Sequence, residues 1–371
     1  MKNLVSLSLA LPLFVIACGS GDTFVVDAGP PPAPDASPPA SDASTGDVIA
    51  QPPPKPTYLA LGDSIAFGYN KNHRTWLSNG TSVELPDQAA YAIGYPESLT
   101  KMVHDDAHVA LDVADISCPG EAVGSLVTGA HVDDNDCWEN RQKYALHYVY
   151  DHEDYDHRDG TEANKENYGS TTSQLDWAQQ LLADDPNHVK LITITAGAND
   201  ALRYGGAACD WTRSLWDVAC MVGGTIDAVL NEVQARWQIT LTAIATSGYT
   251  GPVVAVLYYS TGYRLTDLPM RAGIKLLNAK IHDAAKAVLA VQPTLNLKFV
   301  ESYDLFQAGS SAYGGDVCKA GLTMLMTAGP DKGTCDVHPS NEGEALLASA
   351  VWKSLTFAEQ QAVIASGHPV Q

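Results

Sequence analysis

The apolar residues of this chain follow two alternating patterns, short continuous runs and longer stripes with helical spacing. The short runs predict buried strands over 58–61, 109–116, 189–195, 252–259 and 297–300. The stripes predict helices over 95–104, 173–183, 225–246, 269–291 and 342–355. Because strands and helices alternate, we expect an α/β fold with a central parallel sheet and helices on both faces, a three-layer α/β/α sandwich.

Polar residues follow three of the predicted strands where each strand ends. Asp63 and Ser64 come directly after the first strand, Gly120 follows the second, and Asn199 follows the third. The carboxyl ends of parallel strands open on one edge of the sheet, so these residues are expected to lie close together. His338, late in the chain, can join them there.

This set of residues contains the parts of a nucleophilic acyl-transfer site, namely a hydroxyl, a base and several N–H donors for an oxyanion. Simpler interpretations exist for two of the parts. Asp63 and Ser64 also suit the cap of a following helix, and Pro119-Gly120 is a common turn sequence. The nucleophile elbow of α/β-hydrolases is excluded, because Ala66 stands where its final glycine would be.

Four sequence blocks carry a resemblance to a known family. Gly62-Asp63-Ser64-Ile65, Gly120, Gly197-Ala198-Asn199-Asp200 and His338-Pro339 resemble the signature blocks of SGNH (GDSL-type) hydrolases, over about residues 57–355. The resemblance implies a flavodoxin-like sandwich and esterase chemistry with neither cofactor nor metal. It further implies that Ser64 is the nucleophile and His338 the general base. The implied oxyanion hole consists of the backbone N–H groups of Ser64 and Gly120 and the Asn199 side chain.

The acid of the catalytic site departs from the family pattern. The family has an aspartate three residues before the histidine, but Cys335 occupies that position and Asp336 lies only two residues before His338. Either Asp336 orients the histidine, which we favour, or a backbone carbonyl does so in a Ser–His dyad.

The N-terminus predicts export. Residues 1–18 have an early lysine and an apolar stretch too short to span a bilayer, which is typical of a signal peptide. Val15-Ile16-Ala17-Cys18 resembles the lipobox of bacterial lipoproteins, in which the cysteine is lipidated; an ordinary secreted protein cut nearby is the alternative. Residues 19–56 hold ten of the 21 prolines and predict a disordered linker, and 57–371 form the predicted hydrolase domain.

The net charge limits the kinds of partner to be expected, and the cysteine content indicates the compartment. A net charge of −21 argues against nucleic acid and against electrostatic docking on anionic lipid, so a membrane is expected to be contacted only through the lipid anchor. We expect an ester substrate and a monomer. Six cysteines besides Cys18 predict three disulfides in an exported chain. Fifteen connectivities are possible, and we favour pairing of nearest neighbours: Cys118–Cys137, Cys209–Cys220 and Cys318–Cys335.

An acidic, histidine-rich segment over about 131–168 interrupts the strand–helix pattern. His152, Glu153 and Asp154 offer metal ligands, but their spacing matches no known loop site, so a solvated insertion is the preferred interpretation and a lid over the site the second.

The sequence therefore predicts a serine esterase of the bacterial cell envelope, lipid-anchored in the periplasm or on the cell surface, or secreted. Lipids or simple esters are the expected substrates. The alternatives are a carbohydrate acetylesterase and a surface binding protein that has lost activity. Residues 76–91 and 131–168 could line either a sugar groove or an acyl pocket.

Overall fold

The computed structural model describes residues 56–70, 72, 74–76, 82–84, 93–128, 148–149, 173–203, 225–329 and 332–370. The predicted signal peptide, the linker and Cys18 lie outside these residues, as does the predicted insertion except for 148–149. Among the helices of the described residues, none combines the length and the hydropathy that a membrane crossing requires.

Five parallel strands form the centre of the fold. They are β1 (Tyr58–Gly62), β5 (Val113–Asp115), β7 (Leu191–Thr195), β8 (Val253–Val256) and β9 (Leu297–Val300). Their order in the sheet is β5-β1-β7-β8-β9, the flavodoxin-like order, and β6 (Tyr148–Val149) adds an antiparallel edge beside β5. Every residue of β1, β7 and β8 is buried, which explains why these strands are continuous apolar runs.

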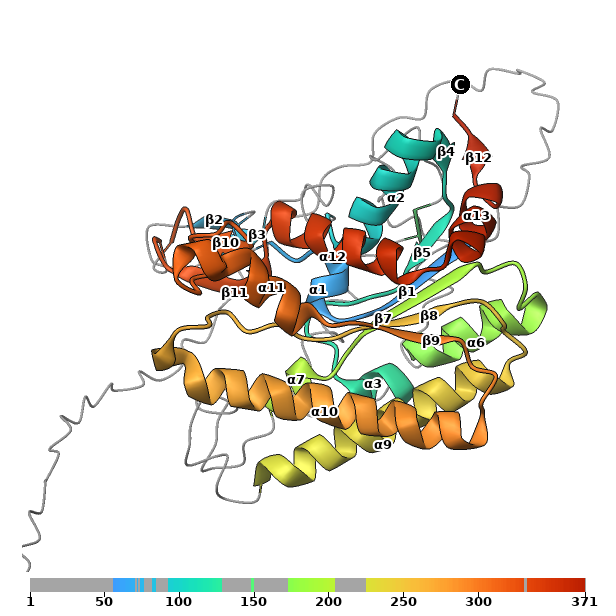
Figure 1. The fold of residues 1–371 in the computed structure, drawn as a ribbon, viewed down its shortest axis with the longest axis horizontal. Coiled ribbons are helices and arrows are strands. Elements are labelled where there is room, and N and C mark those ends of the chain that lie inside the picture. Colours follow the sequence, from blue (N-terminus) through green and yellow to red (C-terminus); the bar gives the residue numbers. More distant parts are fainter. Residues whose placement is uncertain are drawn as a thin grey trace, which may run out of the picture. The chain divides into compact units, whose positions relative to one another are not determined.

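Helices cover both faces of the sheet (Figure 1). One face carries α2 (Tyr95–Ala107) and α12 (Asn341–Ser354), and the other carries α3 (Val123–Thr128), α6 (Gln174–Asp184), α9 (Thr225–Thr246) and α10 (Leu268–Val291). The predicted three-layer α/β/α sandwich is confirmed.

The helical stripes predicted α2, α6, α9, α10 and α12 closely. The bounds of α9 are those predicted, and Ser173 caps α6 by accepting a hydrogen bond from the Asp176 N–H. The apolar stripe of α9 faces the core through residues such as Trp237. The Trp237 indole N–H donates to the Ala196 carbonyl at 2.9 Å, which holds the chain just beyond β7.

The predicted strand over 109–116 is wrong as a single element. The structure divides it into β4 (Val109–Ala110), which pairs with β12 (His368–Pro369), and β5 in the main sheet. Between them the Asp112 carbonyl accepts the N–H groups of both Thr57 and Tyr58, at 2.8 and 3.0 Å. This shared acceptor marks the point where pairing passes from β12 to the main sheet.

Several elements were not predicted. They include α3, β6, β12, α7 (Ala198–Arg203), α11 (Ser302–Ser310), α13 (Phe357–Ala365) and the hairpins β2 (Arg74–Trp76)–β3 (Ser82–Glu84) and β10 (Thr323–Leu325)–β11 (Cys335–Pro339). The short helix α1 (Ser64–Phe67) was weighed only as the helix that Asp63 and Ser64 would cap. The helix predicted over 342–355 is α12, and α13 follows it. These short elements have few apolar positions from which a period could be read.

Candidate active site

Ser64 lies at the junction between β1 and α1. Gly62 ends β1 at φ +155°, and a side chain there would place its Cβ 2.6 Å from the Thr195 carbonyl oxygen, so only glycine fits. Asp63 caps α1 by accepting the Ile65 N–H at 3.0 Å. The capping interpretation is therefore correct for Asp63, and the cap delivers Ser64 to the carboxyl edge of the sheet.

His338 lies on β11 and contacts Ser64. The Ser64 Oγ is 2.9 Å from His338 Nε2, although 274 residues separate them in the sequence. The ring of Tyr69 meets the His338 ring edge-on, with centroids 5.0 Å apart. Strand pairing and ring packing thus hold the imidazole against the serine hydroxyl.

Asp336 is buried and contacts His338 twice. Its Oδ1 accepts the backbone N–H of His338 at 2.9 Å and also hydrogen-bonds with the ring Nδ1. A carboxylate has no proton to donate, so Nδ1 must carry the ring proton. Nε2 is then left as an acceptor that faces the Ser64 hydroxyl.

Asn199 joins Ser64 and His338 in lining one pocket, whereas Gly120, in the turn after β5, is not among the residues that line it. The Asn199 Nδ2 donates to the Glu121 carbonyl at 3.0 Å. An amide nitrogen carries two hydrogens, so this bond leaves one for another acceptor. The same bond ties Asn199 to the residue that follows Gly120.

Gln174 is a buried residue of the site region that sequence reasoning missed. Its side chain accepts the Gly62 N–H at 2.8 Å and donates to the Gly62 carbonyl at 2.9 Å and to Glu121 Oε2 at 2.7 Å. It therefore joins the end of β1 to the loop after β5. No local pattern indicates these contacts, because Gly62 and Glu121 lie 112 and 53 positions from Gln174 in the chain.

The lining of the pocket beside Ser64 is mainly apolar. It has a volume of about 130 Å³, and Ile65, Met270, Ile274 and Val337 contribute aliphatic surface. One water molecule needs about 10–15 Å³, so the pocket has room for the acyl part of an ester.

Two buried carboxyl groups adjoin the site. Burial raises the pKa of Asp63 to about 6 and the pKa of Asp200 to about 7. Asp200 Oδ2 accepts the Val123 N–H at 2.8 Å, so the residue after Asn199 holds the start of α3. Within the described residues, no group of three or more His, Cys, Asp or Glu side chains is arranged to hold a metal ion.

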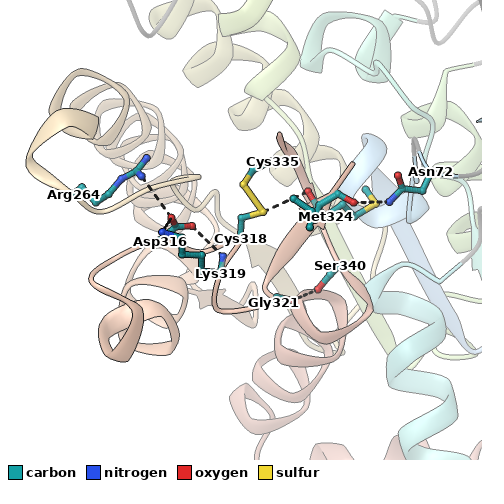
Figure 2. The surroundings of a disulfide bond; sticks show 10 residues. Asn72, Arg264, Asp316, Cys318, Lys319, Gly321, Met324, Cys335 and Ser340 are labelled. Carbon is teal, nitrogen blue, oxygen red and sulfur yellow. Dashed lines mark hydrogen bonds and ion pairs between the residues drawn. A yellow bond between two sulfur atoms is a disulfide. The ribbon is translucent and has the colours of Figure 1, made fainter. Parts of the chain in front are cut away.

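The hairpin that carries His338 is cross-linked. Figure 2 shows the disulfide between Cys318 and Cys335, the pairing expected for these two residues, at the start of β11. The Asn72 side chain donates to the Leu325 carbonyl of β10 at 3.0 Å, and Ser340 just after β11 hydrogen-bonds with the Gly321 carbonyl. Cys118 is also disulfide-bonded. Cys137, Cys209 and Cys220 lie outside the described residues, so the other two pairings remain predictions.

A family model matches most of the chain. Residues 58–351 match the model of the family described as GDSL-like Lipase/Acylhydrolase, so the protein is of the ester hydrolase class. The chain belongs to the GDSL-like lipase/acylhydrolase family, as the four sequence blocks predicted.

Solved structures with a similar fold are distant in sequence, and no curated protein matches the chain. An acetylxylan esterase from Geobacillus stearothermophilus is 14% identical, with 81% of this chain and 94% of that chain covered and a TM-score of 0.42. An extracellular lipase from Streptomyces rimosus is 15% identical, with 81% and 99% covered and a TM-score of 0.43. A phospholipase A1 from Streptomyces albidoflavus NA297 is 13% identical, with 81% and 100% covered and a TM-score of 0.39. At these values the similarities say nothing about the substrate of this chain.

Proposed function

We propose that the protein is an exported serine esterase that cleaves carboxylic esters through an acyl-enzyme formed on Ser64. The observation that carries the proposal is the position of His338, which contacts Ser64 Oγ through one ring nitrogen and Asp336 through the other. These three side chains come from two segments far apart in the chain, and an aliphatic pocket opens beside them.

In the proposed mechanism the proton moves along these contacts. His338 Nε2 takes the Ser64 proton as Oγ attacks the ester carbonyl, and it returns that proton to the departing alcohol. Asp336 keeps the proton on Nδ1 and stabilises the imidazolium that forms. Water then attacks the acyl-enzyme with His338 as the base, which releases the acid and restores Ser64.

Two residues that line the pocket, Ser64 and Asn199, offer donors for the oxyanion. Ser64 is the first residue of α1, where an N–H group has no acceptor within the helix. Asn199 has a second amide hydrogen beyond the one bound to Glu121. We assign the oxyanion to these two donors and to the Gly120 N–H, as the family resemblance implies.

The pocket supports an acyl ester of an aliphatic acid as the substrate. Its aliphatic lining residues favour a hydrocarbon chain, and its volume of about 130 Å³ favours a short one. A site assembled with a contacting serine and histidine also argues against a binding protein that has lost activity.

Export is supported by the Cys318–Cys335 disulfide, because such bonds persist in oxidising compartments. We propose the cell envelope, with lipid attachment at Cys18, on the strength of the sequence around Cys18.

The test of the proposed function is hydrolysis of a series of nitrophenyl esters of increasing chain length by the wild type and by Ser64→Ala, run beside acetylated xylan. The variant is expected to fold normally and to lose about 10⁶-fold in kcat. Equal activity in the purified variant and the wild type would overturn the proposal. Cleavage of acetylated xylan alone would instead favour the carbohydrate acetylesterase.

A further inference from the structure

Two adjacent tyrosines follow β8, and neither was singled out by the sequence. Tyr258 and Tyr259 are both buried, and both line the pocket. The Tyr258 hydroxyl donates to Asp63 Oδ2 at 2.5 Å, while the other oxygen of Asp63 caps α1. Tyr258 therefore holds the residue immediately before the serine.

Tyr259 makes the corresponding contact on the other side of the site. Its hydroxyl donates to the Val337 carbonyl at 2.6 Å, so it holds the residue immediately before the histidine. Its ring stacks on Phe306, with centroids 3.8 Å apart and planes 9° from parallel. A hydroxyl on a stacked, buried ring has little freedom to follow β11 if β11 moves.

The backbone between the two rings is itself anchored. Asn278 of α10 accepts the Tyr258 N–H at 3.0 Å and donates to the Tyr258 carbonyl at 2.8 Å. These two bonds continue the hydrogen bonding of β8 beyond its last residue, and β8 lies inside the sheet between β7 and β9 (Figure 1). The tyrosine pair thus follows a central strand whose end is hydrogen-bonded to α10.

We propose that Tyr258 and Tyr259 are positioning residues that set the separation of Ser64 and His338 from a single rigid point. The proposal rests on the proposed function. Ser64 and His338 lie on separate segments, and each segment is bound one residue upstream by one of two neighbouring side chains. An error of about 1 Å in such a pair costs on the order of 100-fold in rate, so a shared anchor has a large effect on catalysis.

Tyr258→Phe and Tyr259→Phe test the proposal, because each keeps the ring and removes only the hydroxyl. Each variant is expected to lower kcat by about 10- to 100-fold and to change KM by less than about threefold. The matched control is Tyr249→Phe. Tyr249 is also buried and donates to a backbone carbonyl, that of Pro252 at 3.0 Å, but it lies before β8, at the opposite end of that strand. The control is expected to lose comparable thermal stability and to keep its kcat.

A fluorophosphonate reagent separates this proposal from the proposed function without any ester substrate. Ser64 Oγ bonds to phosphorus as the P–F bond breaks, fluoride leaves and His338 Nε2 takes the hydroxyl proton, and intact mass reports the rate. Labelling of the wild type but not of Ser64→Ala supports the function, and labelling slowed at least tenfold in Tyr258→Phe or Tyr259→Phe supports the positioning role. Wild-type rates in both tyrosine variants, with their stability lowered as in Tyr249→Phe, would overturn the positioning role alone. No labelling of Ser64 in the wild type would overturn the function.

Discussion

One carboxylate oxygen of Asp336 accepts the backbone N–H of His338 and hydrogen-bonds with its ring Nδ1. The two residues are separated by one position on β11, where alternate side chains share a face. The family spacing would have placed the acid at Cys335, which is instead in the disulfide. The spacing found here is thus compatible with a carboxylate that orients the histidine.

Asp336→Asn is expected to lower kcat by up to about 10⁴-fold with little change in KM. An amide in this position can donate to Nδ1 and so favour the wrong tautomer of His338. Steady-state kinetics measure the effect. Asp112→Asn is the matched control, because Asp112 is also buried and pairs with a histidine, His368 at 2.8 Å, outside the site. A loss of less than about tenfold in Asp336→Asn would favour a Ser–His dyad.

Asn199→Ala is expected to lower kcat by about 10²- to 10³-fold, since it removes one of several oxyanion donors. The effect should appear with every ester tested, because the oxyanion is common to all of them. Asn296→Ala serves as the control, since Asn296 also donates through its amide, to Glu359 at 2.6 Å, but away from the pocket. Equal kcat values for the two variants would remove Asn199 from the oxyanion hole.

Loss of the Cys318–Cys335 disulfide is expected to lower the free energy of unfolding by about 3 kcal/mol, as for a closed loop of this size. The double variant Cys318→Ser/Cys335→Ser tests this by urea denaturation, without reducing other disulfides. Because Cys335 begins the strand of Asp336 and His338, kcat is expected to fall as well. An unchanged urea midpoint would contradict the structural role of the bond.

Asp200→Asn is expected to change how stability depends on pH. Burial raises the pKa of folded Asp200 to about 7, whereas an unfolded aspartate titrates near 3.9. Between about pH 4 and pH 7 the unfolded chain therefore binds fewer protons at this residue than the folded chain, and stability falls as pH rises. The neutral asparagine removes this loss and can still accept the Val123 N–H.

Urea midpoints of wild type and Asp200→Asn at pH 4, 5.5, 7 and 8 measure the difference. Relative to the wild type, the free energy of unfolding of the variant is expected to rise by up to roughly 4 kcal/mol between pH 4 and pH 7. No further rise is expected above pH 7. Asp283→Asn, at an exposed position of α10, is the control. A constant difference across the range would show that Asp200 ionises alike in both states.

Cys18→Ser is expected to release the protein from the membrane fraction and to leave its specific activity unchanged. Stable anchoring depends on the lipid added to this thiol, and the predicted linker separates it from the site. Fractionation followed by an esterase assay measures both. A variant that still sediments with membranes would disprove the lipid anchor.

The sequence by itself determined the layers of the fold and three of the residues in the pocket. The period of apolar residues defined α9 and α10, and continuous apolar runs defined β1 and β7, because burial on one or both faces leaves a local pattern. Ser64 and Asn199 followed from those strands, since the residue after a parallel strand lies at the shared edge. His338 followed from its block near the C-terminus.

Only the tertiary structure decided what holds those residues in place. Tyr258 and Asp63 are 195 positions apart, and Gln174 and Gly62 are 112 positions apart, so no local pattern links either pair. The contact of Asp336 with His338 also depended on β11, a strand formed only by pairing with β10. A buried polar side chain is stabilised by the partner that the fold brings to it, and that partner is fixed by packing over the whole domain rather than by neighbours in the chain.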